Sequence, residues 1–157
     1  MQPGTGDGQM GVARMLPRTD LIIVTTPAVS AQKVAIRAAD MARRSFLRIA
    51  GVIENMSAFT CEHGTNYPLF GSGGGQNLAT EIGSELLGQI PIESDVSHGS
   101  DNGEPVAIAG VGLAAEVFRD IAKKIISQTV PVNEMAGCSA RMLESVALAL
   151  GEKPSKK

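Results

Sequence analysis

Apolar side chains at the start of the chain follow two different spacings. Residues 21–24 form an unbroken run of Leu, Ile and Val, which is typical of a parallel strand covered on both faces by helices. The next apolar positions, Val34, Ala38 and Met41, recur at helical spacing between about residue 30 and residue 45. The exposed face of this helix is predicted to carry the basic side chains Lys33, Arg37, Arg43 and Arg44.

The rest of the pattern continues the alternation of strands and helices. The sequence predicts a strand over residues 49–53, a loop over 57–75, a helix over 76–84, a short strand over 86–91, a helix from 103 onward and a last helix over 139–150. This order predicts an α/β fold, with a doubly wound, mostly parallel sheet flanked by helices.

The helix that starts near residue 103 has Pro105 in its first turn, a position that proline favours. Its apolar residues recur every fourth position, which predicts one buried face made of Leu113, Val117, Ile121 and Ile125. We expect residues 1–128 to belong to one domain and residues 129–157 to form a C-terminal helix with a loose tail.

Composition and charge limit the classes of function. The 157 residues are 43% hydrophobic and 19% charged with a net charge of −2, which is normal for a globular protein and does not favour nucleic acid or a membrane as partner. No apolar run approaches the length of about 18 residues that spans a bilayer. The two cysteines, Cys61 and Cys138, lie far apart in sequence and are expected to be free thiols, so a cytoplasmic protein is predicted.

Two Gly-rich segments are candidates for binding an anion. Residues 3–7 read PGTGD, and residues 70–76 read FGSGGGQ and lead into a predicted helix, where backbone N–H groups can hold an anion. Flexibility is the alternative explanation for the second segment, because no Lys or Arg lies beside it. A phosphate loop that ends in Gly-Lys-Ser/Thr is absent from the sequence.

A different candidate is Asn55, which follows the predicted strand over residues 49–53. Parallel sheets gather their ligand contacts at the carboxyl ends of their strands, so this side chain is suited to reading a base. Capping of a turn is an equally good explanation for an Asn in this place.

The aromatic residues Phe59, Tyr67 and Phe70 flank Cys61 and His63. Thiolate and imidazole are ligands that suit zinc, copper or iron–sulfur chemistry, which makes this loop a candidate metal site. Two ligands do not close a tetrahedral site, however. The alternative is a packed surface loop around a small buried thiol.

In this order, the segments resemble one family, the Mrp/Nbp35-type iron–sulfur cluster carrier ATPases, which are deviant P-loop proteins related to MinD and to nitrogenase iron protein. Each matching segment is weak alone, and the combination is specific. The matches cover most of the chain up to about residue 124 and comprise residues 3–7, 24–27, 51–57, 70–75, 87–91 and 100–106.

The resemblance implies a nucleotide site for ATP with Mg²⁺. Asn55 would hydrogen-bond the adenine, and Pro91 would line the pocket of the base. The nucleotide-sensing switch would consist of Gly4, Thr5, Gly6 and the catalytic Asp7.

The resemblance also implies that the loop with Cys61 binds the cluster across a homodimer interface, for delivery to apo iron–sulfur proteins. The family carries Cys-x-x-Cys here, and its second Cys falls at Gly64, so His63 is the remaining second ligand. Two copies would then supply two thiolates and two imidazoles, a mixture that Rieske-type clusters use. Loss of the cluster is the other alternative, and both stay open.

The chain departs from the family most strongly in the phosphate loop. The deviant Walker A motif with its two lysines precedes the switch in the family, and these 157 residues do not contain it. We therefore expect that the chain is the C-terminal portion of the ATPase. It should not hydrolyse ATP alone, because no Walker A lysine neutralises the charge that develops in phosphoryl transfer. The competing predictions are a non-catalytic scaffold without nucleotide or cluster and a partition ATPase related to MinD.

Overall fold

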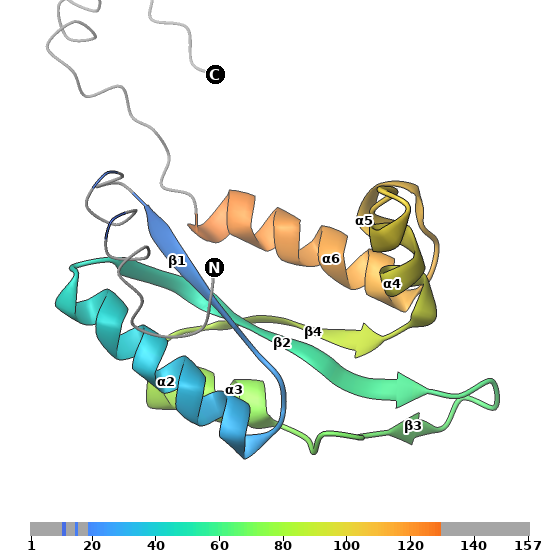
Figure 1. Ribbon diagram of the computed structural model, residues 1–157, viewed down its shortest axis with the longest axis horizontal. Coiled ribbons are helices and arrows are strands. Elements are labelled where there is room, and N and C mark those ends of the chain that lie inside the picture. Colours follow the sequence, from blue (N-terminus) through green and yellow to red (C-terminus); the bar gives the residue numbers. More distant parts are fainter. Residues whose placement is uncertain (1–10, 12–14, 16–18, 130–157) are drawn as a thin grey trace, which may run out of the picture.

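The computed structural model describes residues 11, 15 and 19–129 (Figure 1). The elements in chain order are β1 (Asp20–Thr25), α2 (Val29–Arg44), β2 (Arg48–Thr60), β3 (Asn66–Tyr67), α3 (Gly74–Glu81), β4 (Leu86–Ile92), α4 (Ser94–Asp101), α5 (Val106–Ala109), α6 (Leu113–Lys124) and a π-helical turn (Ile125–Thr129). This order confirms the predicted α/β fold. The last predicted helix, over residues 139–150, lies outside the described residues.

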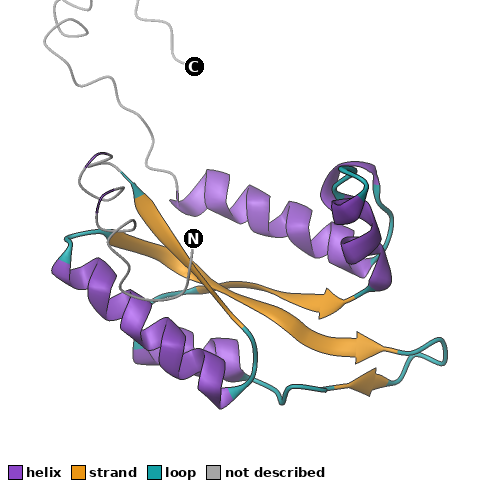
Figure 2. Ribbon diagram, in the orientation of Figure 1, coloured by secondary structure: helices purple, strands orange, loops and turns teal. Residues whose placement is uncertain are grey.

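The centre of the sheet is β2, which pairs in parallel with β1 on one side and with β4 on the other. Figure 2 shows α2 and α3 on one face of these strands and α6 on the opposite face. One apolar cluster joins α2 and α3 to the sheet through residues such as Val52 and Leu78, and a second joins α6 to β4 through Leu87 and Ile121. The chain therefore builds three layers with a core on each side of the sheet.

The second strand is longer than the sequence pattern predicts. It continues past residue 53 to Thr60, and its last residues pair antiparallel with β3, opposite Tyr67 and Asn66. The register shifts between Asn55 and Phe59, where Met56 has a left-handed φ of 57°. The predicted loop over residues 57–75 is thus partly wrong, because it contains a two-stranded hairpin that projects from the body of the sheet (Figure 1).

The predicted inner face of α2 is also partly wrong. Val34 is 38% exposed, whereas Ala35, Ala39 and Met41 are buried and the four basic residues are exposed as predicted. Small alanine side chains let the helix approach β1 and β2 closely, so the core selects them rather than the larger Val. The prediction that both faces of the first strand are covered fails at Val24, which is 58% exposed.

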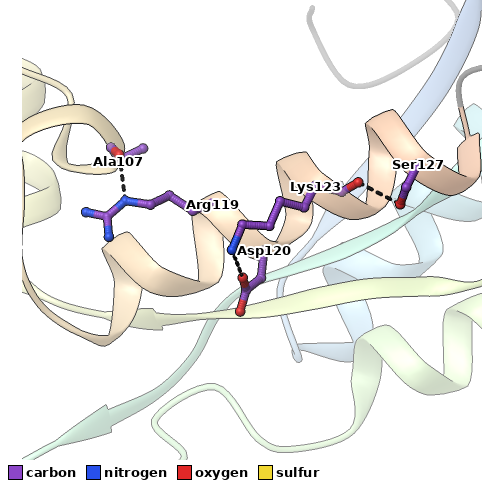
Figure 3. A network of polar contacts seen from close by, with 5 residues as sticks. All are labelled: Ala107, Arg119, Asp120, Lys123 and Ser127. Carbon is purple, nitrogen blue, oxygen red and sulfur yellow. Dashed lines mark hydrogen bonds and ion pairs between the residues drawn. The ribbon is translucent and has the colours of Figure 1, made fainter. Parts of the chain in front are cut away.

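The helix predicted from residue 103 is divided into α5 and α6, and Leu113 is exposed at the start of α6. Arg119 bridges the two helices, because its Nε donates to the carbonyl oxygen of Ala107 at 2.9 Å and its guanidinium also reaches Gly110 (Figure 3). The polar segment that precedes α5 and contains His98 forms the helix α4. Among the described residues, no helix is long and apolar enough to cross a membrane.

Candidate functional site

The predicted site residues fall into three groups. Those of the nucleotide-sensing switch, Gly4, Thr5, Gly6 and Asp7, lie outside the described residues. Asn55 and Pro91 lie on the neighbouring strands β2 and β4, and Cys61 and His63 lie in the turn of the projecting hairpin.

The two residues implied in the base pocket lie near each other because β2 and β4 are parallel. Asn55 pairs with Ile90, which directly precedes Pro91. Asn55 is half-buried, and its Oδ1 accepts a hydrogen bond from the backbone N–H of Met56 at 2.9 Å. The turn-forming role expected as an alternative is therefore present, while the amide nitrogen, for which residues 19–129 record no partner, is available as a donor to a base.

A buried carboxylate that the sequence analysis did not single out lies directly beside Asn55. The side chain of Glu54 is 1% exposed, and each of its oxygens accepts one hydrogen bond. Its Oε2 accepts from the backbone N–H of Gly75 at 2.5 Å, and its Oε1 accepts from Nε2 of Gln89 at 2.6 Å. The signal in the sequence was a glutamate that directly follows the apolar run of a predicted buried strand. A buried charge requires partners, so this position predicts a hydrogen-bonded carboxylate.

This contact decides between the two explanations for the Gly-rich segment over residues 70–76. The first turn of α3 does hold an anion, and that anion is the carboxylate of Glu54. A Cβ atom at Gly74 would lie 2.4 Å from the carbonyl oxygen of Pro27, and one at Gly75 would lie 2.6 Å from Cβ of Glu54. Close packing, rather than flexibility, therefore explains these two glycines.

The hairpin turn has a defined backbone geometry. The N–H of Cys61 donates to the carbonyl oxygen of Thr65 at 3.0 Å, and the N–H of Gly64 donates to the carbonyl oxygen of Cys61 at 2.9 Å. Gly64 has a φ of +77°, a left-handed conformation that residues with a Cβ rarely adopt. Position 64, where the family has its second Cys, therefore has a backbone conformation that favours glycine in this chain.

The sulfur of Cys61 lies in a setting that favours the thiolate. Hydrogen bonding from the backbone of Thr65, and next from that of His63, lowers the pKa of this thiol, and partial burial opposes the shift. Cys61 is half-buried and His63 is exposed. A thiolate, and not a thiol, is the form that binds metal ions.

The aromatic residues near Cys61 do not cover it. Apolar side chains on β2, on β3 and in the segment after β3 are exposed and form what we call the hairpin surface, which consists of Met56, Phe59, Tyr67, Leu69 and Phe70. The interpretation as a packed loop around a buried thiol is therefore wrong. Among the described residues, no group of three or more His, Cys, Asp or Glu side chains lies close enough to hold a metal ion.

Among the described residues, Asn55 and Pro91 are the two that the resemblance assigns to the base. Asn55 has an amide nitrogen for which residues 19–129 record no partner, and Pro91 is buried. At the first turn of α3, the N–H of Gly75 is already taken by Glu54.

The chain is similar to known proteins. Residues 1–126 match the family model described as ParA, the NUBPL iron-transfer P-loop NTPase. The chain is 40% identical over 115 residues to the iron-sulfur cluster carrier protein of Mycobacterium tuberculosis, which covers 69% of this chain and 30% of that protein. It is 33% identical over 135 residues to the iron-sulfur cluster transfer protein NUBPL of Dictyostelium discoideum, which covers 85% of this chain and 42% of that protein.

A solved structure is similar as well. The nucleotide-binding protein of Archaeoglobus fulgidus in complex with ADP superimposes with a TM-score of 0.54 at 33% identity, over 66% of this chain and 43% of that chain. The chain thus spans less than half the length of each of these relatives. Sequence and fold agree, and the chain belongs to the ParA family of NUBPL-type iron-transfer P-loop NTPases.

Proposed function

We propose that this chain is the part of an iron–sulfur cluster carrier that holds the cluster and the base of the nucleotide. The observation that carries the proposal is the Cys61 thiol, half-buried on a projecting hairpin, with a lowered pKa and an exposed apolar surface around it. The names of the relatives from Mycobacterium tuberculosis and Dictyostelium discoideum support cluster transfer as the activity. The cluster is the cargo, and apo iron–sulfur proteins are the recipients.

Two copies of the chain would share one cluster. Each copy offers Cys61 and His63, and a four-coordinate set needs four ligands, so two copies supply two thiolates and two imidazoles. The hairpin surface supports this arrangement, because it gathers several exposed apolar side chains in one short segment, and exposed apolar surface is typical of a protein interface. We propose a homodimer in which the two hairpins face each other.

The proposal includes a nucleotide in the intact protein. ATP with Mg²⁺ would place its base against Asn55 and Pro91, and Gly4, Thr5, Gly6 and Asp7 would sense its phosphates. Bound nucleotide supplies a charge whose loss on hydrolysis can change the hold of the dimer on the cluster. A cytoplasmic location is part of the same proposal.

Anaerobic reconstitution with iron and sulfide tests the cluster site. We expect wild type to give a visible absorption band and a dimer in light scattering, with one cluster for two chains. Cys61→Ala removes the two thiolates and should abolish the band and reduce the dimer. His63→Ala should bind less cluster or lose it faster.

The matched control is Cys138→Ala, which removes the other cysteine of the chain and should leave the spectrum unchanged. An identical spectrum for wild type and Cys61→Ala would exclude Cys61 from the site. A spectrum that is lost in Cys61→Ala but retained in His63→Ala would exclude the imidazole as a ligand.

A further inference from the structure

One buried carboxylate closes the base of the segment that carries Cys61. After Glu54 the chain continues along β2, which still pairs with β4 at Asn55 and at Phe59, into the hairpin, and it returns to the sheet at the first turn of α3, where Gly75 donates to Oε2 of the same Glu54. Most residues of the segment 55–73 are exposed. Glu54 is therefore covalently joined to the start of this segment and hydrogen-bonded to its end.

The second oxygen of this carboxylate binds the neighbouring strand. Oε1 accepts from Gln89 on β4, two residues before Pro91, so the carboxylate connects the implied base pocket with the segment that carries the hairpin. Because Glu54 is almost completely buried, losing either donor would leave a desolvated acceptor without compensation. Both contacts are thus expected to be kept in the folded protein.

The hairpin is also linked to β4, since Phe59 pairs with Ile92. Ser57 Oγ donates to the carbonyl oxygen of Ile90 at 3.1 Å, and Met56, with its left-handed φ, marks the point at which β2 turns away. Gly75 also packs closely against Glu54, since a Cβ atom at this position would lie 2.6 Å from Cβ of Glu54. The direction of the hairpin depends on how its two ends are fixed.

We propose that Glu54 is a positioning residue that fixes the Cys61 hairpin relative to the ends of β2 and β4. It does not contact the cluster, and it acts through the segment over residues 55–73. The part of the proposal that concerns cluster retention rests on the proposed function, whereas the part that concerns the orientation of the hairpin does not.

Two substitutions at this position separate hydrogen bonding from packing. Glu54→Met keeps the length and apolar volume of the side chain and removes both acceptors. Glu54→Gln keeps the acceptor for Gly75 and remains able to pair with Gln89, because the amide of Gln89 can turn by 180°. If Glu54 only fills space, Met can replace it. If its hydrogen bonds position the hairpin, Gln can replace it and Met cannot.

The primary measurement is amide hydrogen exchange of the 157-residue chain. In Glu54→Met we expect exchange over residues 57–75 to become about tenfold faster, which corresponds to losing one hydrogen bond to a charged group, with little change in α2 and α6. Glu54→Gln should stay close to wild type. Gln89→Met should lie between them, and, because Gln89 is exposed, it tests the proposal even where Glu54→Met does not fold.

The matched control is Glu81→Met, the same substitution at the exposed end of α3, which should leave exchange in the hairpin unchanged. Two outcomes overturn the proposal: hairpin exchange that stays at the wild-type rate in both Glu54→Met and Gln89→Met, or exchange that rises equally in α2 and α6.

Cluster retention is measured on the same variants, as the rate at which a chelator removes iron. Glu54→Met should lose the cluster several times faster than Glu54→Gln. If wild type takes up no cluster, the proposed function fails while the exchange experiment still decides the role of Glu54. If all variants retain the cluster equally well, the role of Glu54 in cluster retention is overturned.

Discussion

The body of the sheet and the projecting hairpin are built in opposite ways. In the body, Val52 and Leu78 are completely buried, and apolar contacts between layers determine the structure. In the hairpin, Phe59 and Tyr67 form a cross-strand pair but both remain exposed, and hydrogen bonds at the base and in the turn determine its shape. The comparison teaches that stability and the candidate chemistry are located in different parts of the chain, connected by Glu54.

The largest difference between the two regions is expected for truncation of a large apolar side chain. Leu78→Ala should lower the free energy of unfolding by about 2–5 kcal/mol, because it opens a cavity between α3 and the sheet. Phe59→Ala in the hairpin should cost less than about 1 kcal/mol, because its side chain is already exposed. Urea unfolding of both variants measures this, and equal losses would contradict the division into two regions.

Glycine substitutions compare the same two regions, with smaller expected losses of stability. Gly74→Ala should cost about 1–3 kcal/mol, because its Cβ atom would overlap the backbone of Pro27. Gly64→Ala meets no atom within 4 Å and should cost only about 1 kcal/mol, from its left-handed conformation. Thermal unfolding compares the two, and a larger loss for Gly64→Ala would show that the turn matters more to stability than the helix contact.

Reactivity of Cys61 tests the hairpin by itself. Because hydrogen bonding from Thr65 and His63 lowers the pKa of the thiol, the folded chain holds more thiolate at neutral pH than the unfolded chain does. In a Cys138→Ala background, the rate of alkylation by iodoacetamide should therefore rise at lower pH in the folded chain than in urea. Coincident pH profiles would show that the turn geometry does not act on the sulfur.

The smallest effect is expected at the start of β1 and β2, where Asp20 and Arg48 pair. The hydrogen bond from Arg48 lowers the pKa of Asp20 below its unfolded value, so this pair stabilises the fold above about pH 4, and the contribution is lost as the pH falls through the folded pKa. Asp20→Asn should cost about 0.5 kcal/mol at pH 7, because the pair is partly exposed, and less at pH 2.

The control for this prediction is Asp120→Asn, which removes an exposed pair with Lys123 on α6 (Figure 3) and should change stability less. A difference between Asp20→Asn and wild type that persists unchanged at pH 2 would contradict the assignment to this ion pair.

Local patterns were sufficient to predict the elements of the body. The apolar runs that became β1 and β4 and the helical spacing of α2 were found near their observed positions, because these segments bury a continuous or periodic set of side chains. The hairpin was missed, since its exposed strands have no apolar periodicity and depend on pairing between Phe59 and Tyr67. The division of α5 from α6 was missed because it depends on contacts between residues distant in sequence: Glu93 accepts from the N–H of Ala114 at the start of α6, and Arg119 on α6 donates to Ala107 in α5.

The sequence by itself determined the α/β alternation, the family, and the residues with candidate chemistry, because each is a matter of residue type, order and spacing along the chain. Only the tertiary structure decided why glycines occupy the first turn of α3 and where Cys61 lies. Both depend on Glu54, whose partners Gly75 and Gln89 lie 21 and 35 residues away. Hydrogen bonds between residues so far apart in sequence form only when the strands and the helix have packed together. The local sequence pattern therefore cannot predict them.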